Sequence, residues 1–292
     1  MPIQHLAASL FVVLWSTGFI GAKLGLPYSE PMTFLGVRFG VVAVLMAVWV
    51  WLSRARWLTR RQTAEQILIG ALVHFAYLGG VFTAIEWGVE AGMSALIVGL
   101  QPVLMAWIAG LLLGERLAKL QWLGMALGLV GVLLVVIRKL DAGIGDWSGV
   151  AVNIVGLVAI SIGTILQKRL SADTPQRAGG MVQFASGATC CLVLAFLYED
   201  MVIEWAPEMI IAMTWSIFVL SFGAITLLYF LTRRGAAANV ASMFFLVPPC
   251  TAIIAWPLFG ETLGWVEIGG IAATALGVLM VNRPELFRRQ TT

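Results

Sequence analysis

Charged residues are scarce in this sequence. Only 11% of the 292 residues are Asp, Glu, Lys or Arg, whereas 60% are hydrophobic, and the mean hydropathy is +0.95. Soluble domains carry charge on about a quarter of their residues, so a soluble globular fold is excluded. The apolar runs are about 20 residues long and continuous, without the alternation of a transmembrane β-strand. They predict an all-α membrane protein with many spans.

Cysteines and catalytic motifs are also few. Cys190, Cys191 and Cys250 lie inside apolar runs without metal-ligand spacing, so we interpret them as packing residues and expect no metal and no cofactor. The motif G-x-x-x-x-G-K-[ST] is absent, which excludes an ATP site of that type in this chain. Neither H-E-x-x-H nor G-x-S-x-G occurs, which disfavours an intramembrane enzyme. The N-terminus lacks the basic region and cleavage site of a signal peptide, so residues 5–24 are expected to stay as the first helix.

One stretch of the sequence occurs twice. Residues 102–115 read PVLMAWIAGLLLGE, and 146 residues later 248–261 read PPCTAIIAWPLFGE. Compared without gaps, residues 91–135 and 237–281 share 17 identities in 45 positions. Apolar composition alone does not align a Pro, a Gly-Glu pair and a later Gly at one offset. Because 146 is half of 292, the chain is predicted to be one unit duplicated end to end.

Ten membrane spans can be marked, five in each half of the chain, 1–146 and 147–292. No connecting loop is long enough to fold by itself, so the two halves are expected to form one membrane unit. The spans cover residues 5–24, 32–52, 66–87, 93–112, 119–137, 147–168, 177–197, 209–231, 238–258 and 264–282.

The basic residues set the expected orientation. Of the 18 Lys and Arg residues, 14 fall in the loops after spans two, four, six and eight and at the C-terminus. Only Lys23, Arg138 and Lys139 fall on the other side, where the carboxylates collect. Because cytoplasmic loops are rich in Lys and Arg, both termini are predicted to be cytoplasmic. The net charge of +3 follows this topology and does not indicate nucleic-acid binding.

The odd number of spans in each half has a mechanistic consequence. The second half must enter the membrane from the side opposite to the first. Such inverted-topology repeats are the architecture of secondary transporters, whose substrate site lies near the bilayer midplane between the repeats. Two inverted copies can exchange conformations, so that one half opens inward while the other opens outward. The sequence therefore predicts transport by alternating access.

These features resemble the EamA family of the drug/metabolite transporter (DMT) superfamily. The matching residues are W-S-T-G-F at 15–19, Arg38 in the second span, and the repeated P-x11-G-E of spans four and nine. The resemblance covers essentially the whole chain and implies export from the cytoplasm across a bacterial inner membrane. The ten-span form is most similar to the YddG-type exporters, which favour aromatic and other neutral amino acids. Residues 15–18 correspond to Ser-Ile-Gly-Thr at 161–164, so we expect an asymmetric pocket.

Arg38 is the charged residue that lies inside a span, where insertion scales put the cost of an Arg at about 3 kcal/mol. It is a candidate carboxylate-binding or outer-gate residue. The alternative is a structural role, either as a donor to helix carbonyls or as a partner of Glu86. Both interpretations stay open at the level of the sequence.

Other residues are candidates for the wall of a cavity. His74 and Tyr77 share one face of span three, and packing is the alternative role for both. Pro102 removes a backbone donor and frees the carbonyl of Val98, so we expect a kink that either changes only the helix shape or presents this carbonyl to a substrate. The full set of candidate substrate-binding residues is Trp15, Thr17, Gly18, Arg38, His74, Tyr77, Gln101, Met105, Ser161, Thr164, Gln183 and Tyr229.

We predict that Trp15, His74, Tyr77 and Gln101 line the substrate site. A pocket of Trp, Tyr, Met, Gln and hydroxyl groups suits a neutral zwitterion with an apolar side chain. No Asp or Glu lies in mid-span, so a carboxylate proton relay has no place, and His74 is the mid-span group that titrates near neutral pH. Facilitated export or exchange is therefore expected, without tight proton coupling.

Two other functions remain as alternatives. The first is a broad-specificity drug or nucleoside/metabolite exporter of the same fold. The second is a non-transporting membrane sensor or lipid-handling protein. The expected partners are a small neutral substrate and the lipid bilayer, and no enzymatic activity is expected.

Small residues recur on spans five and ten. Their spacing is the small-xxx-small pattern, which either packs the chain internally or forms a dimer seam. We expect a functional monomer and leave a dimer open. The residues are Gly124, Gly128 and Gly131 on span five, and Gly269, Ala273 and Gly277 on span ten.

Overall fold

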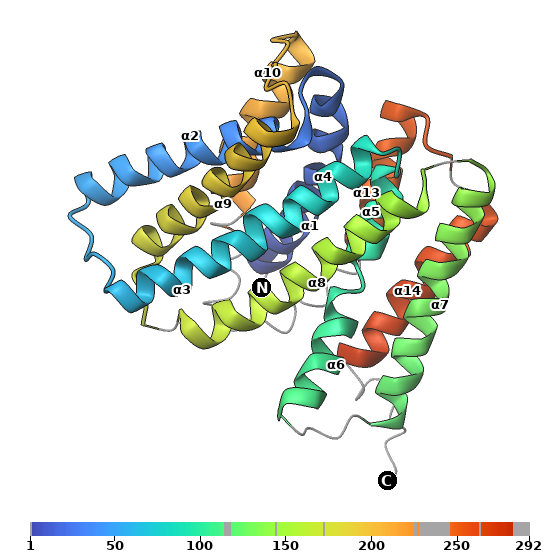
Figure 1. Ribbon diagram of the computed structural model, residues 1–292. Helices are drawn as coiled ribbons and strands as arrows, with labels where there is room; N and C mark the ends of the chain where they lie inside the picture. The colour runs from blue at the N-terminus through green and yellow to red at the C-terminus, as the bar shows by residue number, and fades with distance from the viewer. Residues whose placement is uncertain are drawn as a thin grey trace. The chain divides into compact units, whose positions relative to one another are not determined.

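The computed structural model of this chain is built from helices (Figure 1). It describes residues 2–113, 118–143, 145–171, 173–224, 227, 246–262 and 264–282. Within these ranges the only pairing of extended backbone is one antiparallel bridge between Ser29 and Ile203. The all-α class predicted from the hydropathy is therefore confirmed for the described part of the chain.

The helices follow the predicted spans, and several spans consist of two or three consecutive elements. The first half of the chain contains α1 (Pro2–Gly25), η1 (Leu26–Tyr28), α2 (Pro31–Leu52), α3 (Arg60–Gly70), η2 (Ala71–Tyr77), α4 (Leu78–Glu86), α5 (Ala91–Val98), α6 (Gln101–Leu113) and α7 (Lys119–Asp141). The second half contains α8 (Trp147–Leu170), α9 (Gln176–Tyr198), α10 (Pro207–Thr214), η3 (Trp215–Ala224), α13 (Val247–Phe259) and α14 (Trp265–Asn282).

Seven helical segments in the described ranges are long and apolar enough to cross a membrane. Three shorter apolar helices lie where spans four, nine and ten are predicted, at Ala91–Met105, Val247–Phe259 and Trp265–Val281. A membrane protein of several spans is thus confirmed, whereas ten complete crossings stay a prediction. The seven segments are Ser9–Tyr28, Pro31–Leu52, Arg60–Glu86, Lys119–Asp141, Trp147–Leu170, Gln176–Tyr198 and Pro207–Ala224.

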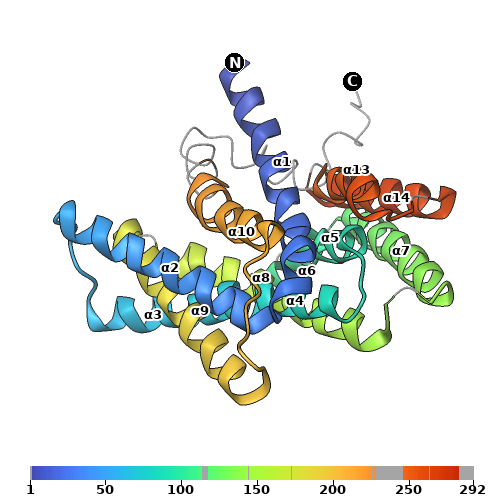
Figure 2. The same cartoon turned by 90° about the horizontal axis from the view of Figure 1, so that it is seen from above.

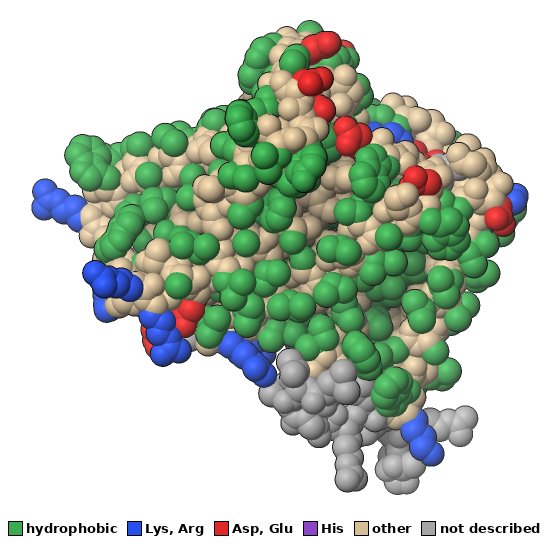
Figure 3. Space-filling model, viewed as in Figure 1, with side chains coloured by type: hydrophobic (Ala, Val, Ile, Leu, Met, Phe, Trp, Pro, Cys, Tyr) green, Lys and Arg blue, Asp and Glu red, His purple; other side chains and the backbone are tan. Residues whose placement is uncertain are grey.

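Large apolar side chains cover the outside of these helices, as Figure 3 shows for one face. Val44, Trp51, Leu134 and Phe196 are among the exposed ones, and each lies within or at the end of a long apolar helix. A continuous apolar surface of this kind marks contact with a membrane or a partner. Here it matches the hydrocarbon core of a bilayer, since the helices that carry it have the length of membrane spans.

The helices gather into two compact units, and each unit combines helices from both halves of the sequence. Unit 1 comprises Met1–Ile20, Trp87–Val150 and Gly223–Thr292, and unit 2 comprises Gly21–Glu86 and Ala151–Phe222. Packing in space therefore does not follow the boundary between the two predicted repeats. The limits of the repeats stay a prediction from the sequence.

In unit 1, α7 and α14 lie side by side in two perpendicular views (Figures 1 and 2). The backbone of Gly124 meets that of Gly277, and Gly131 meets the backbone of Gly270. Residue numbers rise along one helix as they fall along the other, so the two helices are antiparallel. Glycines allow this close approach because no side chain separates the backbones.

The contacts between α7 and α14 have the pattern of a two-fold axis. Gly270 and Gly277 stand 146 positions after Gly124 and Gly131, and each glycine meets the counterpart of the other one. A symmetric interface between two equivalent elements produces this exchange of contacts. The small residues of spans five and ten therefore pack the chain internally.

The small residues of α14 that contact α7, called the seam below, differ in part from those expected from the sequence. Gly270, Thr274 and Gly277 face α7, and the Thr274 hydroxyl donates to the Gly270 carbonyl at 2.8 Å. A Cβ added to Gly269 would meet nothing within 4 Å. The prediction that Gly269 belongs to the seam is wrong, because the residues that face α7 are spaced i, i+4, i+7 and begin at Gly270.

In unit 2, α2 and α9 are the second spans of the two predicted repeats, and they are also antiparallel. Gly36 contacts Leu192, and Gly180, nearer the start of α9, contacts Met46, nearer the end of α2. Two pairs of corresponding spans thus run in opposite directions through their own unit.

Carboxylates cap helix N-termini in both units. Glu261, directly after α13, accepts hydrogen bonds from the backbone N–H groups of Ala91 (2.8 Å) and Gly92 (3.1 Å) at the start of α5. Glu199, directly after α9, accepts from the N–H groups of Met32 (2.8 Å) and Thr33 (2.7 Å) at the start of α2. These N–H groups have no partner within their helix, and the helix dipole favours a negative charge beside them.

This geometry assigns a structural role to the Gly-Glu pair in its second copy. Gly260 ends α13 in the left-handed conformation, with φ of +68°, which glycine adopts at low cost. The turn then directs Glu261 to the start of α5. The first copy, at 114–115, lies outside the described residues.

Lys139 forms a buried ion pair at the same end of unit 1. Its Nζ lies 2.8 Å from Glu90 Oε2 and donates to the Thr262 carbonyl at 2.9 Å, and the exposed fractions of the Lys139 and Glu90 side chains are only 5% and 13%. We expect Lys139→Met to lower the free energy of unfolding by about 3 kcal/mol, because it leaves the Glu90 carboxylate buried without its partner. Thermal unfolding in detergent micelles measures this change.

The exposed pair of Arg61 and Glu65 provides the matched control. Its nitrogen and oxygen are also 2.8 Å apart, but the Arg61 side chain is 85% exposed. Arg61→Gln should therefore change the stability by less than about 0.5 kcal/mol. Equal destabilisation by the two variants would contradict the role of burial, as would no loss in Lys139→Met.

Candidate functional site

The fourth span is broken in the middle. α5 ends at Val98, Gly99 and Leu100 form the link, and α6 begins at Gln101. Pro102 has no N–H to donate to the Val98 carbonyl, so an uninterrupted helix would lack a hydrogen bond at this point. The interruption predicted from Pro102 is present in the structure.

The ninth span has a helix end at the equivalent place. α13 begins at Val247 with Pro248 in its first turn, and these residues stand 146 positions after Gln101 and Pro102. A Cβ added to Gly99 would lie 3.0 Å from Pro248 Cγ, so the two helix ends are in contact within unit 1. Ser16 of α1 donates to the Val12 carbonyl (2.8 Å) and contacts the Val247 carbonyl at 3.3 Å.

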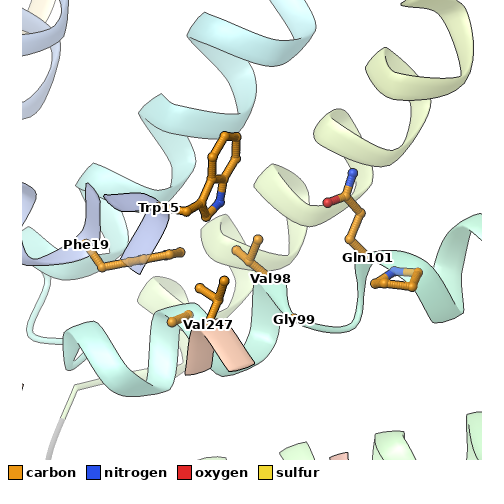
Figure 4. A pocket seen from close by; sticks show the side chains of 8 residues that line it. Trp15, Phe19, Val98, Gly99, Gln101 and Val247 are labelled. Carbon is orange, nitrogen blue, oxygen red and sulfur yellow. The ribbon is translucent and has the colours of Figure 1, made fainter. Parts of the chain in front are cut away.

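A pocket lies where these helix ends meet α1 (Figure 4). Its cavity volume is about 10 Å³ in this structure, about the room that one water molecule needs. In Figure 4 the Trp15 indole and the Gln101 amide extend in the same direction from their two helices. The lining residues are Trp15, Phe19, Ala95, Val98, Gly99, Gln101, Pro102 and Val247.

The chemistry of the pocket wall is neutral. Apolar side chains make most of it, and its polar side-chain groups are the Trp15 indole N–H and the Gln101 amide. The Gln101 amide nitrogen contacts the Met105 sulfur at 3.8 Å, which is a weak interaction that a ligand can replace. No charged side chain contributes to the described wall. Such a wall suits a neutral ligand with an apolar or aromatic part.

Unit 2 contains a separate group of buried polar residues. Arg38 is 6% exposed, and its Nη2 donates to the Ser221 hydroxyl at 3.3 Å. Ser221 in turn donates to the Ser216 carbonyl at 3.0 Å, five residues earlier in η3. The guanidinium carbon lies 5.4 Å from the centre of the Phe39 ring. Among the described residues, the expected alternative partners of Arg38, Glu86 or helix carbonyls, form no hydrogen bond or ion pair with it.

His74 and Tyr77 are buried in the same unit. The His74 ring stacks on Phe184 with 4.2 Å between the centres, and the Phe39 ring lies 5.3 Å away. Both His74 and Tyr77 lie within electrostatic range of Arg38. Two adjacent aromatic rings thus fix the His74 imidazole in place.

His74 and Tyr77 belong to a π-helical segment, η2, and Ser216 and Ser221 belong to a second one, η3. Shifted by 146 residues, η2 falls inside η3, so the two widened turns occupy equivalent positions in the third and eighth spans. π-Helical turns widen the backbone and occur frequently at functional sites. The hydropathy of the sequence does not predict these π-helical segments.

Both halves of the chain match one known protein family. The profile of the EamA-like transporter family matches residues 3–137 and again residues 147–283. The chain belongs to the EamA-like transporter family.

Relatives of this EamA-like transporter span nearly its whole length. An uncharacterized transporter of Bacillus subtilis, YvbV, is 27% identical over 95% of the chain and 90% of its own length. A protein of Salmonella typhimurium named as a probable amino-acid metabolite efflux pump is 26% identical over 93% of the chain and 92% of its own length. A crystal structure of a protein superposes with a TM-score of 0.68 over 100% of both chains at 16% identity, which supports the fold.

The predicted site residues of this EamA-like transporter fall into two groups. Trp15 and Gln101 line the pocket of unit 1, where Met105 contacts Gln101. Thr17 and Gly18 are on α1 beside them, but the Thr17 hydroxyl donates to the Leu14 carbonyl at 2.6 Å. Neither residue lines the pocket. Arg38, His74 and Tyr77 lie in unit 2. Of the four residues predicted to line one site, Trp15 and Gln101 therefore belong to unit 1, whereas His74 and Tyr77 belong to unit 2.

The other predicted polar residues of unit 2 have partners within the protein. The Ser161 and Thr164 hydroxyls donate to carbonyls of their own helix, Leu157 and Ile160, both at 2.7 Å. The Gln183 amide nitrogen donates to the amide oxygens of Gln66 (2.5 Å) and Gln167 (2.7 Å). Gln183 thus joins α3, α8 and α9 at one end of the unit. Tyr229 lies outside the described residues.

Sequence reasoning missed most of the pocket wall. Phe19, Gly99 and Val247 carry no polar group that distinguishes them from other apolar residues of a span. One signal was present, because Phe19 belongs to the W-S-T-G-F motif and the other two lie close to the two repeated prolines. Gln66 and Gln167 lie near span ends, where a polar residue is common and carries little information. Among the described residues, no group of three potential metal ligands is present.

Proposed function

We propose that this EamA-like transporter exports small neutral metabolites, most of all aromatic and other neutral amino acids, by alternating access. The observation that carries the proposal is the pocket of unit 1, where two equivalent helix ends meet Trp15 and Gln101. Helices interrupted at corresponding positions of two repeats are the best sequence-level indication of a transporter binding site. The name of the Salmonella relative, a probable amino-acid metabolite efflux pump, agrees with this substrate class.

The pocket offers partners for the ammonium group and for the apolar side chain of a neutral amino acid. The break after Val98 frees backbone carbonyls that accept hydrogen bonds from an ammonium group. The Trp15 indole and Phe19 ring give an apolar side chain a surface to pack on, and aromatic pairs add attraction beyond the buried area. A charged substrate side chain would find no counter-charge in the described wall.

Three packing observations support inverted repeats at 1–146 and 147–292. The antiparallel pairs α7–α14 and α2–α9 are corresponding spans, and the glycine contacts of the first pair exchange in a two-fold manner. Glu90, Lys139 and Glu261, all predicted on the outer side, meet at one end of unit 1. Together with the basic loops, this favours ten spans with both termini cytoplasmic in an inner membrane. The internal use of the glycine seam favours a monomer.

Counterflow into liposomes that hold the purified protein tests the substrate class. Labelled phenylalanine, leucine, glutamate, lysine and a nucleoside are offered outside, with the unlabelled compound inside. We expect the two neutral amino acids to accumulate at least tenfold above protein-free liposomes, because the wall is apolar and uncharged. Accumulation of the nucleoside alone would overturn the amino-acid assignment. No accumulation of any compound would overturn transport.

The same liposomes test the coupling. No carboxylate lies in mid-span, so we expect exchange to proceed at equal pH on both sides and to change less than about twofold when a pH gradient is imposed. Transport that depends strictly on the gradient would contradict facilitated export or exchange.

A further inference from the structure

Arg38 places a charge in the interior of unit 2 without a carboxylate beside it. The side chain is 6% exposed, and its one hydrogen-bond partner among the described residues is the neutral Ser221 hydroxyl, at a long 3.3 Å. Every residue of unit 2 except residue 172 is described, so all carboxylates of this unit are accounted for. None of them forms an ion pair with Arg38.

Several polar groups around Arg38 are also left without partners. The Arg38 Nε, the His74 Nδ1 and the Ser216 Oγ are buried and have no hydrogen bond. His74 and Ser216 belong to the two π-helical segments, and Arg38 reaches η3 through Ser221. Buried polar groups in proteins are paired in the great majority of cases, so the unpaired Arg38 Nε and His74 Nδ1, which lie within electrostatic range of each other, call for a specific explanation.

A buried guanidinium without a counter-anion is strongly unfavourable, because the charge loses water and gains no opposite charge. The described residues supply no such charge. The Arg38 Nε–H is free to donate to an anion, and the Ser221 hydroxyl lies beside the guanidinium. One small anion would supply the negative charge that this cluster lacks.

We propose that Arg38, with Ser216 and Ser221 of η3, forms a binding site for one small monovalent anion of the carboxylate or halide type. A single guanidinium balances one charge, whereas a phosphate would bring a second charge that no other cation of the described cluster meets. In its carboxylate form the site deepens the proposed function and rests on it, because the transported amino acid is then also a ligand of unit 2, separately from the pocket of unit 1. In its halide form the site is independent of which substrate the protein transports.

Thermal unfolding of the full-length protein in micelles tests the site. The buffer salt is gluconate, a bulky anion, and sodium acetate or sodium chloride is titrated in at constant ionic strength. We expect the unfolding midpoint to rise saturably by about 3 °C, because an anion that binds only the folded state stabilises it. Arg38→Gln should reduce the rise at least fivefold, whereas Arg61→Gln, which removes an exposed charge, should keep it.

Two further variants decide the result if Arg38→Gln fails to fold. Arg38→Lys keeps the charge but loses the planar fork, and Ser221→Ala removes one hydroxyl of the cluster. Each should raise the anion concentration at half-effect at least threefold. An equal midpoint shift in wild type and in both of these variants would overturn the site, as would no shift in wild type.

A second titration distinguishes the two anion sources. L-Phenylalanine is compared with phenylalaninamide, which keeps the ring and the ammonium group but has no carboxylate. A shift with the amino acid and none with the amide assigns the anion to the substrate. Equal responses to both, beside a response to chloride, assign it to a free halide. If the protein shows counterflow but no anion raises its unfolding midpoint, the anion site is overturned and the proposed transport stands. If an anion raises the midpoint but no counterflow occurs, the anion site stands and the proposed transport is overturned.

Discussion

Gly277→Ala is expected to lower the free energy of unfolding by about 3 kcal/mol, the upper end of the range for an overpacked core. The added Cβ would collide with the Gly124 carbonyl oxygen and lie 2.5 Å from the Gly128 amide nitrogen. Both are backbone atoms of α7, so no rotamer change can make room. The two helices would have to separate along the seam, and the loss should appear as a lower unfolding midpoint in micelles.

Gly269→Ala is the matched control on the same helix. A Cβ at Gly269 meets nothing within 4 Å, and alanine favours a helix by up to about 1 kcal/mol over glycine. This variant should therefore be as stable as wild type or slightly more stable. Equal stability of the two variants would show that α7 and α14 are not in backbone contact. A loss in Gly269→Ala alone would place the seam on the other face of α14.

Trp15→Ala is expected to reduce counterflow of phenylalanine at least tenfold. The indole forms one side of the pocket and packs against Phe11 with 5.4 Å between the ring centres. Its removal takes away both the surface for an aromatic substrate and a hydrogen-bond donor, and losses of about 2 kcal/mol are common for a buried aromatic contact. The rate of counterflow at substrate concentrations below half-saturation measures this loss.

Trp265→Ala provides the control for the loss of a tryptophan. Trp265 begins α14 and is 89% exposed, so its removal should change counterflow less than about twofold.

Gln101→Leu is a second variant of the pocket. It keeps the volume of the pocket and removes the amide, and it should weaken binding of the amino acid without loss of the fold. Unchanged counterflow in both Trp15→Ala and Gln101→Leu would exclude this pocket as the substrate site.

Much of the fold followed from one-dimensional patterns. Apolar runs long enough to span a bilayer predict helices, because only helices satisfy every backbone group within one segment in lipid. The break in the fourth span followed from Pro102, since a missing N–H acts on its own helix. The Gly-Glu pair at 260–261 is visible in the sequence as part of the repeat, and the structure shows which helix start Glu261 reaches. Each of these features depends on residues that are close to one another in the sequence.

The candidate site was predictable only in part. Trp15 and Gln101 were recognised because an indole and an amide are unusual inside a span, and both line the pocket. Phe19 and Val247 were not, because apolar wall residues are indistinguishable from lipid-facing ones until the neighbours are known. The sequence also left open whether Arg38 pairs with Glu86, and the structure shows no such pair. Arg38 meets Ser221, 183 residues away, and no local pattern connects them.

The sequence by itself determined that the chain is a multi-span helical membrane protein of one duplicated unit, because hydropathy and repeats are written in residue order. Only the tertiary structure decided that each compact unit draws helices from both halves, and that the seam on α14 runs through Gly270 rather than Gly269. It also decided which buried charge lacks a partner. Packing and pairing depend on distances between helices, and those distances are set by side chains far apart in the sequence.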